Sequence, residues 1–269
     1  MANGVELVSV AAPGRRCEDY AAAVDGLVVV LDGVTPPHDG DSGCVHDVPW
    51  FVDLLGRTLL EVGQRHGSLA DCLAEAIERT AAAHRTTCDL SHPRTPQATV
   101  AMLRWDDVRV EHLVLSDAAV LLGGQDGTVT AVLDSRLDEL RARPYLAALR
   151  AGPEVGAYRT ALEALRNVPD GFHTAAADPA VVAHAVTGAT PRAAVRAAAA
   201  LTDGATRWRD KFDLGDWADL LEVLRSAGPA ALVEQVRTAE TADADRRNFR
   251  RGKVFDDASA AYVDLGDGV

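Results

Sequence analysis

The sequence predicts an α+β fold in which two antiparallel β-sheets form a central sandwich (αββα) flanked by α-helices. Strand-forming segments are interrupted by one pair of helical segments early in the chain and by another pair late in the chain. The middle strand segments follow one another too closely for parallel crossover connections. The sequence also lacks a regular βαβ repeat and a G-x-G-x-x-G motif, which argues against a doubly wound parallel sheet.

The first third of the chain predicts two strands and then two helices. Residues 5–10 and the continuous apolar run 27–31 are typical of strands, the second one buried on both faces. Apolar side chains recur at helical spacing over residues 51–62, and Ser68 with Asp71 forms a capping signal for the next helix. We expect these helices to pack as an antiparallel pair.

The middle of the chain predicts strands in close succession. They span residues 98–103, 110–115, 119–122 and 128–133, with Asp126-Gly127 as a hairpin turn before the last. The segment 136–167 is helical or irregular, broken by proline and glycine, and is either a lid or simple packing.

The last third predicts further strands around a second pair of helices. Residues 172–176, 195–201 and 260–263 have strand character, although the alanine-rich 195–201 also suits a helix. An apolar stripe from Trp217 to Leu224 indicates one helix, and Pro229 at a first-turn position opens the next. Nothing between these segments resembles a disordered linker, so we expect one domain over 1–269.

Composition and charge limit the possible functions. The chain is 48% hydrophobic but only 5% aromatic, so its core must consist of alanine, valine and leucine. A net charge of -13 is the wrong sign for a nucleic-acid partner. The N-terminus lacks a secretory signal and no stretch is apolar for long enough to span a bilayer, so we expect a cytoplasmic protein without a membrane partner.

The cysteines carry no paired spacing. Cys17, Cys44, Cys72 and Cys88 form no C-x-x-C motif, so the sequence predicts neither a zinc knuckle nor a redox motif. Disulfides are not expected in a reducing compartment, and we expect these residues to act as small core hydrophobes.

Short acidic signatures lie beside the predicted strands. They are Glu18-Asp19, Asp32-Gly33, Asp203-Gly204 and Asp256-Asp257. Carboxylates brought together at strand ends repel one another unless a cation lies among them. The pattern predicts a site for a hard divalent metal, although each pair alone also suits a turn, a cap or a solvated edge.

Six ordered motifs resemble those of the metal-dependent protein phosphatases of the type 2C (PPM) family, and the chain is similar to a divergent bacterial member. They are Gly14-Arg15-Arg16-Cys17-Glu18-Asp19, Val28-Val29-Val30-Leu31-Asp32-Gly33-Val34, Gln97-Ala98-Thr99-Val100-Ala101, Leu115-Ser116-Asp117-Ala118, Leu201-Thr202-Asp203-Gly204 and Phe255-Asp256-Asp257-Ala258-Ser259-Ala260.

The resemblance implies two divalent cations, manganese or magnesium, bound by oxygen ligands. Asp32 would bridge the cations, the Gly33 carbonyl would reach one of them, and Asp203 and Asp256 would hold the other. Glu18 and Asp19 would orient metal-bound waters, and Asp117 would be a ligand of a third cation. Either Arg15 or Arg16 would clamp the phosphate.

The implied reaction is hydrolysis of a phosphomonoester by an activated water, without a phosphoenzyme. The substrate would be phosphoserine or phosphothreonine in a protein or, as a second choice, a small phosphorylated metabolite. The alternative is a phosphatase-fold binding or regulatory protein with weakened catalysis.

Departures from the family pattern support that alternative. Val34 stands where many relatives have a histidine, and His38 is a candidate substitute. The arginine is displaced by one position, since Gly14 stands in its usual place. Arg207 replaces an acidic residue, which puts the third cation in doubt unless Asp210 compensates.

Overall fold

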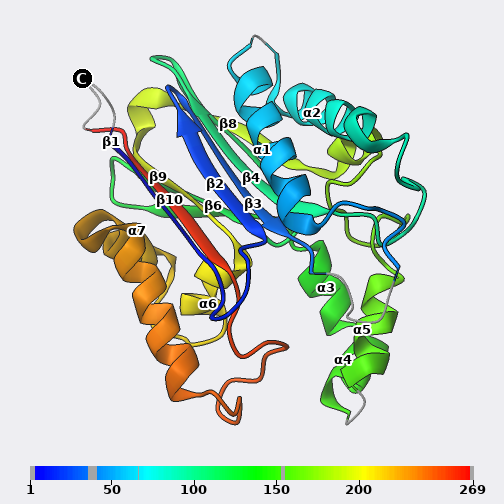
Figure 1. The fold of residues 1–269 in the computed structure, drawn as a ribbon. Coiled ribbons are helices and arrows are strands. Elements are labelled where there is room, and N and C mark those ends of the chain that lie inside the picture. The colour runs from blue at the N-terminus through cyan, green and yellow to red at the C-terminus, as the bar shows by residue number, and fades with distance from the viewer. Residues whose placement is uncertain (1–3, 36–40, 66, 153–154, 267–269) are drawn as a thin grey trace.

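A computed structural model of the chain describes residues 4–35, 41–65, 67–152 and 155–266. Within these ranges ten strands form two five-stranded antiparallel sheets, which confirms the predicted fold class (Figure 1). The first sheet has the strand order β1 (Gly4–Val10), β10 (Ala258–Asp264), β9 (Val195–Leu201), β6 (Ala119–Gly124) and β7 (Val129–Leu133). The second has the order β2 (Asp19–Val24), β3 (Leu27–Gly33), β4 (Ala98–Trp105), β5 (Arg109–Leu115) and β8 (Val186–Pro191).

Each sheet is covered by helices on its outer face, so the molecule has four layers (Figure 1). Helices α1 (Val48–Gly63) and α2 (Leu69–His84) pack against each other and cover the sheet that contains β3. Helices α6 (Asp203–Asp210) and α7 (Trp217–Ala242) cover the sheet that contains β9 and β10. The predicted antiparallel helix pair therefore exists as α1 and α2.

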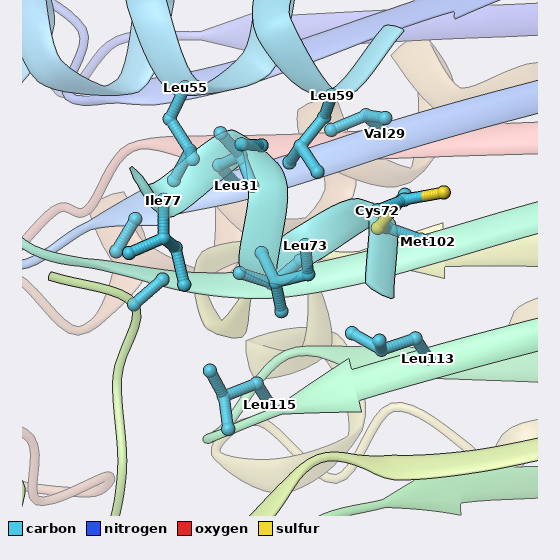
Figure 2. Packing of buried hydrophobic residues seen from close by; sticks show 14 of the residues in the cluster. Val29, Leu31, Leu55, Leu59, Cys72, Leu73, Ile77, Met102, Leu113 and Leu115 are labelled. Atoms are coloured by element: carbon cyan, nitrogen blue, oxygen red, sulfur yellow. The ribbon is translucent and has the colours of Figure 1, made fainter. Parts of the chain in front are cut away.

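Alternation along β3 divides its side chains between two cores. Val29 and Leu31 point toward α1 and α2, where they meet Leu55, Leu73 and their neighbours (Figure 2). Val28 and Val30 point the other way, into the space between the sheets. Because successive side chains in a strand face opposite sides, Asp32 continues the row of Val28 and Val30 and lies at the end of the sandwich interior.

The helix boundaries follow the capping signals. Asp47 caps α1 by accepting from the backbone N–H of Trp50, and Ser68 with Asp71 forms the predicted capping box of α2. Helix α7 contains a break at Gly228, whose φ of 83° lies in the left-handed region, and Pro229 follows it. The two late helices expected from the sequence are therefore the two halves of one kinked α7.

The segment 136–167 is mainly helical. It contains α3 (Arg136–Ala142), α4 (Pro144–Ala151) and α5 (Val155–Glu163), which lie together beside one end of the sandwich (Figure 1). A small apolar cluster of Leu137, Leu140, Leu146 and Phe172 holds this unit together. Two short 3₁₀ helices, η1 (Pro179–His184) and η2 (Arg192–Ala194), flank β8.

Two strands were missed and one prediction was wrong. Residues 172–176 make only isolated bridges, Arg166 with Phe172 and Ala98 with Ala175, and form no strand. The missed strands are β2, with three consecutive alanines, and β8, which contains glycine and proline at the sheet edge. Both depend on pairing with a neighbouring strand rather than on local preference.

None of the helices in the described ranges has the length and apolar character needed to cross a bilayer.

Candidate metal centre

The acidic signatures meet at one end of the sandwich. Antiparallel pairing places the start of β2 beside the end of β3, and the start of β4 beside the ends of β3 and β5. In the other sheet the end of β9 lies beside the start of β10. The residues that follow or precede these strand ends are therefore neighbours. We call the resulting group of Asp19, Asp32, Asp117, Asp203 and Asp256 the acidic cluster.

Asp19 and Asp32 are directly opposite each other in the β2–β3 pair. The Thr202 hydroxyl donates to Asp19 Oδ2 at 3.0 Å, which ties one sheet to the other. Asp19 Oδ1 is buried and has no hydrogen-bond partner among the described residues. The carboxylate oxygens of Asp32 and Asp203 likewise accept no hydrogen bond from the part of the chain that the structure describes. A buried carboxylate oxygen without a partner, such as Asp19 Oδ1, is costly, and Asp32 and Asp203 are half-buried near it, so this group has the character of a cation site.

The pKa values of three aspartates in the acidic cluster are raised. Burial, followed by the charges of Asp203 and Asp19, raises the pKa of Asp32 well above its ordinary value. Burial raises the pKa of Asp19 to about 7. Burial and the charge of Asp256 raise the pKa of Asp203 to about 7, although Arg207 and Lys253 oppose this shift. A bound cation would reverse each of these shifts.

The glycines after Asp32 and Asp203 allow close backbone contacts. A Cβ atom on Gly204 would lie 1.8 Å from the Asp257 carbonyl oxygen, and one on Gly33 would lie 2.4 Å from the Glu18 carbonyl oxygen. The Gly33 N–H donates to that Glu18 carbonyl at 3.0 Å. Asp257 in turn accepts from the backbone N–H groups of Ala12 and Glu18, at 2.6 Å each. These contacts fix the loops that carry the acidic cluster.

Asp256 belongs to the acidic cluster, but both of its carboxylate oxygens accept from cationic side chains. Arg207 Nη2 donates to its Oδ2 at 2.5 Å, and Lys253 Nζ donates to its Oδ1 at 2.7 Å. Arg207 also donates to the buried Glu240 at 2.6 Å. The arginine that departs from the family pattern thus neutralises one of the predicted ligands.

Asp117 is paired with an arginine from the helical segment. Arg141 Nη2 on α3 lies 3.4 Å from Asp117 Oδ2. The preceding Ser116 has a φ of 68°, a left-handed conformation that glycine adopts at lower cost. Asp210 pairs with Arg209 at the surface, at 2.7 Å.

The remaining predicted residues lie next to the acidic cluster. Glu18 accepts from the Thr35 hydroxyl at 2.5 Å and lies 3.9 Å from Arg15. Arg16 points to Asp47, at 2.6 Å, with 76% of its side chain exposed. Arg15 and Arg16 therefore point to different carboxylates. His38 lies outside the described residues.

A cleft of ≈ 300 Å³ adjoins the acidic cluster, and sequence reasoning missed it. Its lining includes Glu18, Val34, Arg94, Gln97 and Arg166. Arg166 Nε is buried and has no partner within the described ranges, and Asp117 is one of the charges that act on its pKa. Arg166 forms an isolated bridge with Phe172, and no sequence motif predicts this contact.

The donor set fits a hard divalent cation in its chemistry. Asp19 Oδ1 and the carboxylate oxygens of Asp32 and Asp203 have no competing donor among the described residues, which suits magnesium or manganese. Asp256 would have to exchange a cationic side chain for the metal. The carboxylates are also more widely spaced than a closed ligand set, because no three of them bring oxygens within 4.8 Å of one another in the described part of the chain.

Comparison with known proteins identifies the fold. No family model and no curated protein matches the chain. The catalytic domain of the serine/threonine protein phosphatase PstP in complex with two manganese ions aligns with 98% of this chain and 99% of its own, at 15% identity and a TM-score of 0.60. The Mycobacterium tuberculosis phosphatase PstP/Ppp covers 99% and 100% at 15% identity, with a TM-score of 0.61.

A third match is PppA, a key regulatory component of T6SS in Pseudomonas aeruginosa. It aligns with 98% of both chains at 16% identity and a TM-score of 0.59. Another similar structure is a PPM Ser-Thr phosphatase from Mycobacterium smegmatis. Over nearly its whole length, the chain has the fold of the metal-dependent serine/threonine phosphatases of the PPM family.

Proposed function

We propose that this protein is a divergent PPM phosphatase that hydrolyses phosphomonoesters with the help of divalent cations, and that its substrates are phosphoserine and phosphothreonine in proteins. The observation that carries the proposal is that the half-buried carboxylates of Asp32 and Asp203 lie among the other carboxylates of the acidic cluster and accept no hydrogen bond from the described residues. The likeness to phosphatases, one of them in complex with two manganese ions, supports the same assignment.

In this proposal Asp32 and Asp203 hold the cations, with the Gly33 carbonyl as a further ligand. When bound, a pair of manganese or magnesium ions supplies positive charge for the phosphoryl oxygens and lowers the pKa of a water molecule. Asp19, held by Thr202, and Glu18, held by Thr35, orient water at the acidic cluster.

Substrate binding in this proposal uses the cleft beside the acidic cluster. Arg166 lines that cleft and is available to bind phosphate oxygens with its guanidinium group. Arg15, 43% exposed and 3.9 Å from Glu18, is a second candidate for this role. Arg16 requires release from Asp47 before it can serve.

The helical segment 136–167 contributes to both parts of the proposed site. Arg141 contacts Asp117, and Arg166 follows directly after α5 in the same unit. Val34 gives the cleft an apolar side chain where relatives have a histidine, so the chain offers no imidazole at that position to protonate the leaving group. We therefore expect faster turnover of aryl phosphates, whose leaving groups need little protonation.

A second candidate function is a phosphatase-fold binding protein with weak catalysis. The ion pairs of Asp256 with Arg207 and Lys253 favour it, since they occupy both oxygens of one predicted ligand. The two functions differ in turnover. An active enzyme hydrolyses an aryl phosphate with added manganese, loses that activity on chelation and regains it when manganese returns.

The test compares the purified protein with its Asp203→Asn variant in that assay. Manganese-dependent hydrolysis by the wild type and its loss in the variant support the phosphatase. Folded wild-type protein that binds manganese without measurable turnover would favour the binding protein.

A further inference from the structure

A second set of metal-ligating side chains lies outside the acidic cluster. It comprises Cys44, in the loop before α1, and His84 and Cys88, at the end of α2 and just beyond it. One donor atom from each of these residues lies within 4.8 Å of the other two. Within the described ranges, this is the only such group of three. We call it the Cys-His cluster.

The donor atoms of the Cys-His cluster face one another. Cys44 Sγ lies 3.4 Å from His84 Nδ1 and 2.7 Å from Cys88 Sγ. The His84 side chain is 1% exposed, and its Nε2 has no partner among the residues that the structure describes. A buried imidazole directed at a pair of sulfurs is a ligand arrangement, because a cysteine pair alone needs no imidazole.

Backbone donors support both sulfur atoms. The N–H of His46 donates to Cys44 Sγ and the N–H of Val45 donates to Cys88 Sγ, at 3.4 Å each. The Thr87 hydroxyl lies 3.6 Å from Cys88 Sγ. Hydrogen bonds to sulfur stabilise the thiolate form, which is the form that binds metal.

Backbone contacts bring the two loops together independently of the sulfur atoms. The N–H of Asp89 donates to the Gly43 carbonyl at 2.7 Å. Gly43 has a φ of 67°, and a Cβ atom there would lie 2.6 Å from Cβ of His92. Backbone contacts therefore hold the two loops together, and they place Cys44 and Cys88 close to each other independently of any bond between the sulfur atoms.

We propose that Cys44, His84 and Cys88 bind a zinc ion, a site that goes beyond the proposed phosphatase function and does not depend on it. His46 stacks on Trp50 with ring centroids 3.8 Å apart, so we assign the fourth position to water. Zinc prefers tetrahedral sulfur and nitrogen ligands with Zn–S distances of about 2.3 Å, which would widen the sulfur separation to about 3.8 Å.

The two proposed sites select different metals. Thiolate and imidazole donors favour zinc, whereas the carboxylates of the acidic cluster favour magnesium or manganese. The zinc ion would have a structural role, because it would tie the loop before α1 to the end of α2. That loop supplies Val45, His46 and Asp47 to the cleft beside the acidic cluster.

The test measures zinc in the full-length protein, purified without chelator and passed over a desalting column. We expect one zinc ion per chain in the wild type. Cys44→Ser, His84→Gln and Cys88→Ser should each lower the zinc content at least tenfold. Cys72→Ala is the matched cysteine control, since Cys72 lies in the apolar core against α1, and it should retain zinc. Asp32→Asn should also retain zinc, which separates this site from the acidic cluster.

Two measurements on the wild type keep the test independent of whether the variants fold. Reconstitution with cobalt should give the thiolate charge-transfer and d–d bands of a tetrahedral site, and zinc should abolish them. Protein unfolded in chelator without reductant should show all four thiols. Only two titratable thiols with a Cys44–Cys88 cross-link, or no uptake of zinc or cobalt, would overturn the proposal. Zinc that is lost in Asp32→Asn but kept in Cys88→Ser would also overturn it.

Discussion

Asp19 on β2 faces Asp32 on β3 across an antiparallel pair, with both side chains directed into the end of the sandwich. Like charges directly opposite each other destabilise a sheet. The fold tolerates the pair because β2 and β3 are anchored by contacts elsewhere, including the bond from Thr202 to Asp19. The repulsion between the two carboxylates therefore acts where a cation would relieve it.

The raised pKa values predict how the stability of the cation-free protein changes with pH. The pKa of Asp19 and that of Asp203 rise from 3.8 to about 7 on folding. Between these values Asp19 and Asp203 bind more protons in the folded state than in the unfolded state, so their contribution to stability is greatest below the lower value and falls as pH rises toward 7. Urea unfolding of chelated protein should give a lower midpoint at pH 8 than at pH 5.5.

Manganese should reverse that trend, because the cation replaces the protons. Its stabilising effect should be larger at pH 8 than at pH 5.5. The Asp19→Asn variant serves as the control and should show a weaker pH dependence in chelator. A wild-type midpoint in chelator that is the same at both pH values would contradict this picture of the acidic cluster.

Substitution of Arg207 tests the buried ion pairs behind Asp256. Arg207→Met removes a partner from Glu240, which is fully buried but keeps a bond to Arg237 at 2.5 Å. We expect a loss of about 3 kcal/mol in the free energy of unfolding, because breaking a buried pair leaves an uncompensated charge. The matched control is Arg225→Met, which removes an exposed pair with Glu222 and should cost less than about 0.5 kcal/mol. Equal losses in the two variants would show that the buried pairs carry no special stability.

Gly204→Ala tests the close approach of the first turn of α6 to the loop before β10 at the acidic cluster. A Cβ atom at this position would lie 1.8 Å from the Asp257 carbonyl oxygen, a backbone atom that cannot rotate away. We expect a loss of about 3 kcal/mol in the free energy of unfolding. Gly156→Ala, in α5 with no atom within 4 Å of its added Cβ, should leave stability unchanged or slightly raised. A Gly204→Ala protein as stable as the wild type would refute the proposed loop contact.

Arg166→Met tests phosphate binding in the cleft. Loss of the guanidinium should raise KM for a phosphopeptide about tenfold with little change in kcat, since the contact is made in both ground and transition states. Arg159→Met, an exposed arginine of α5, is the control and should behave as the wild type. An unchanged KM in Arg166→Met would remove this arginine from the substrate site.

The sequence predicted the sandwich because its long strands and helices are locally consistent. The apolar run of β3 and the capping box of α2 each specify one structure without reference to the rest of the chain. The segments 172–176 and β8 gain their structure from a neighbouring strand, so local preference misjudged both.

The candidate site was predictable only in part, for the same reason. Motif order placed Asp19, Asp32 and Asp203 together, because antiparallel topology fixes which strand ends meet. Motif order could not predict the ion pairs of Asp256, because Arg207 and Lys253 reach that carboxylate through side-chain packing. The Cys-His cluster was missed because 44 positions separate Cys44 from Cys88, and contacts between two loops, such as that of Gly43 with Asp89, bring them together.

The most direct test of the central claim is calorimetric titration of the chelator-stripped protein with manganese. The account predicts that the wild type binds two manganese ions and that Asp32→Asn binds manganese at least about 100-fold more weakly, because Asp32 would help to hold both ions. The exposed-site variant Asp210→Asn should bind as the wild type does. Wild-type protein that takes up no manganese, or an Asp32→Asn protein that binds it unchanged, would contradict the account.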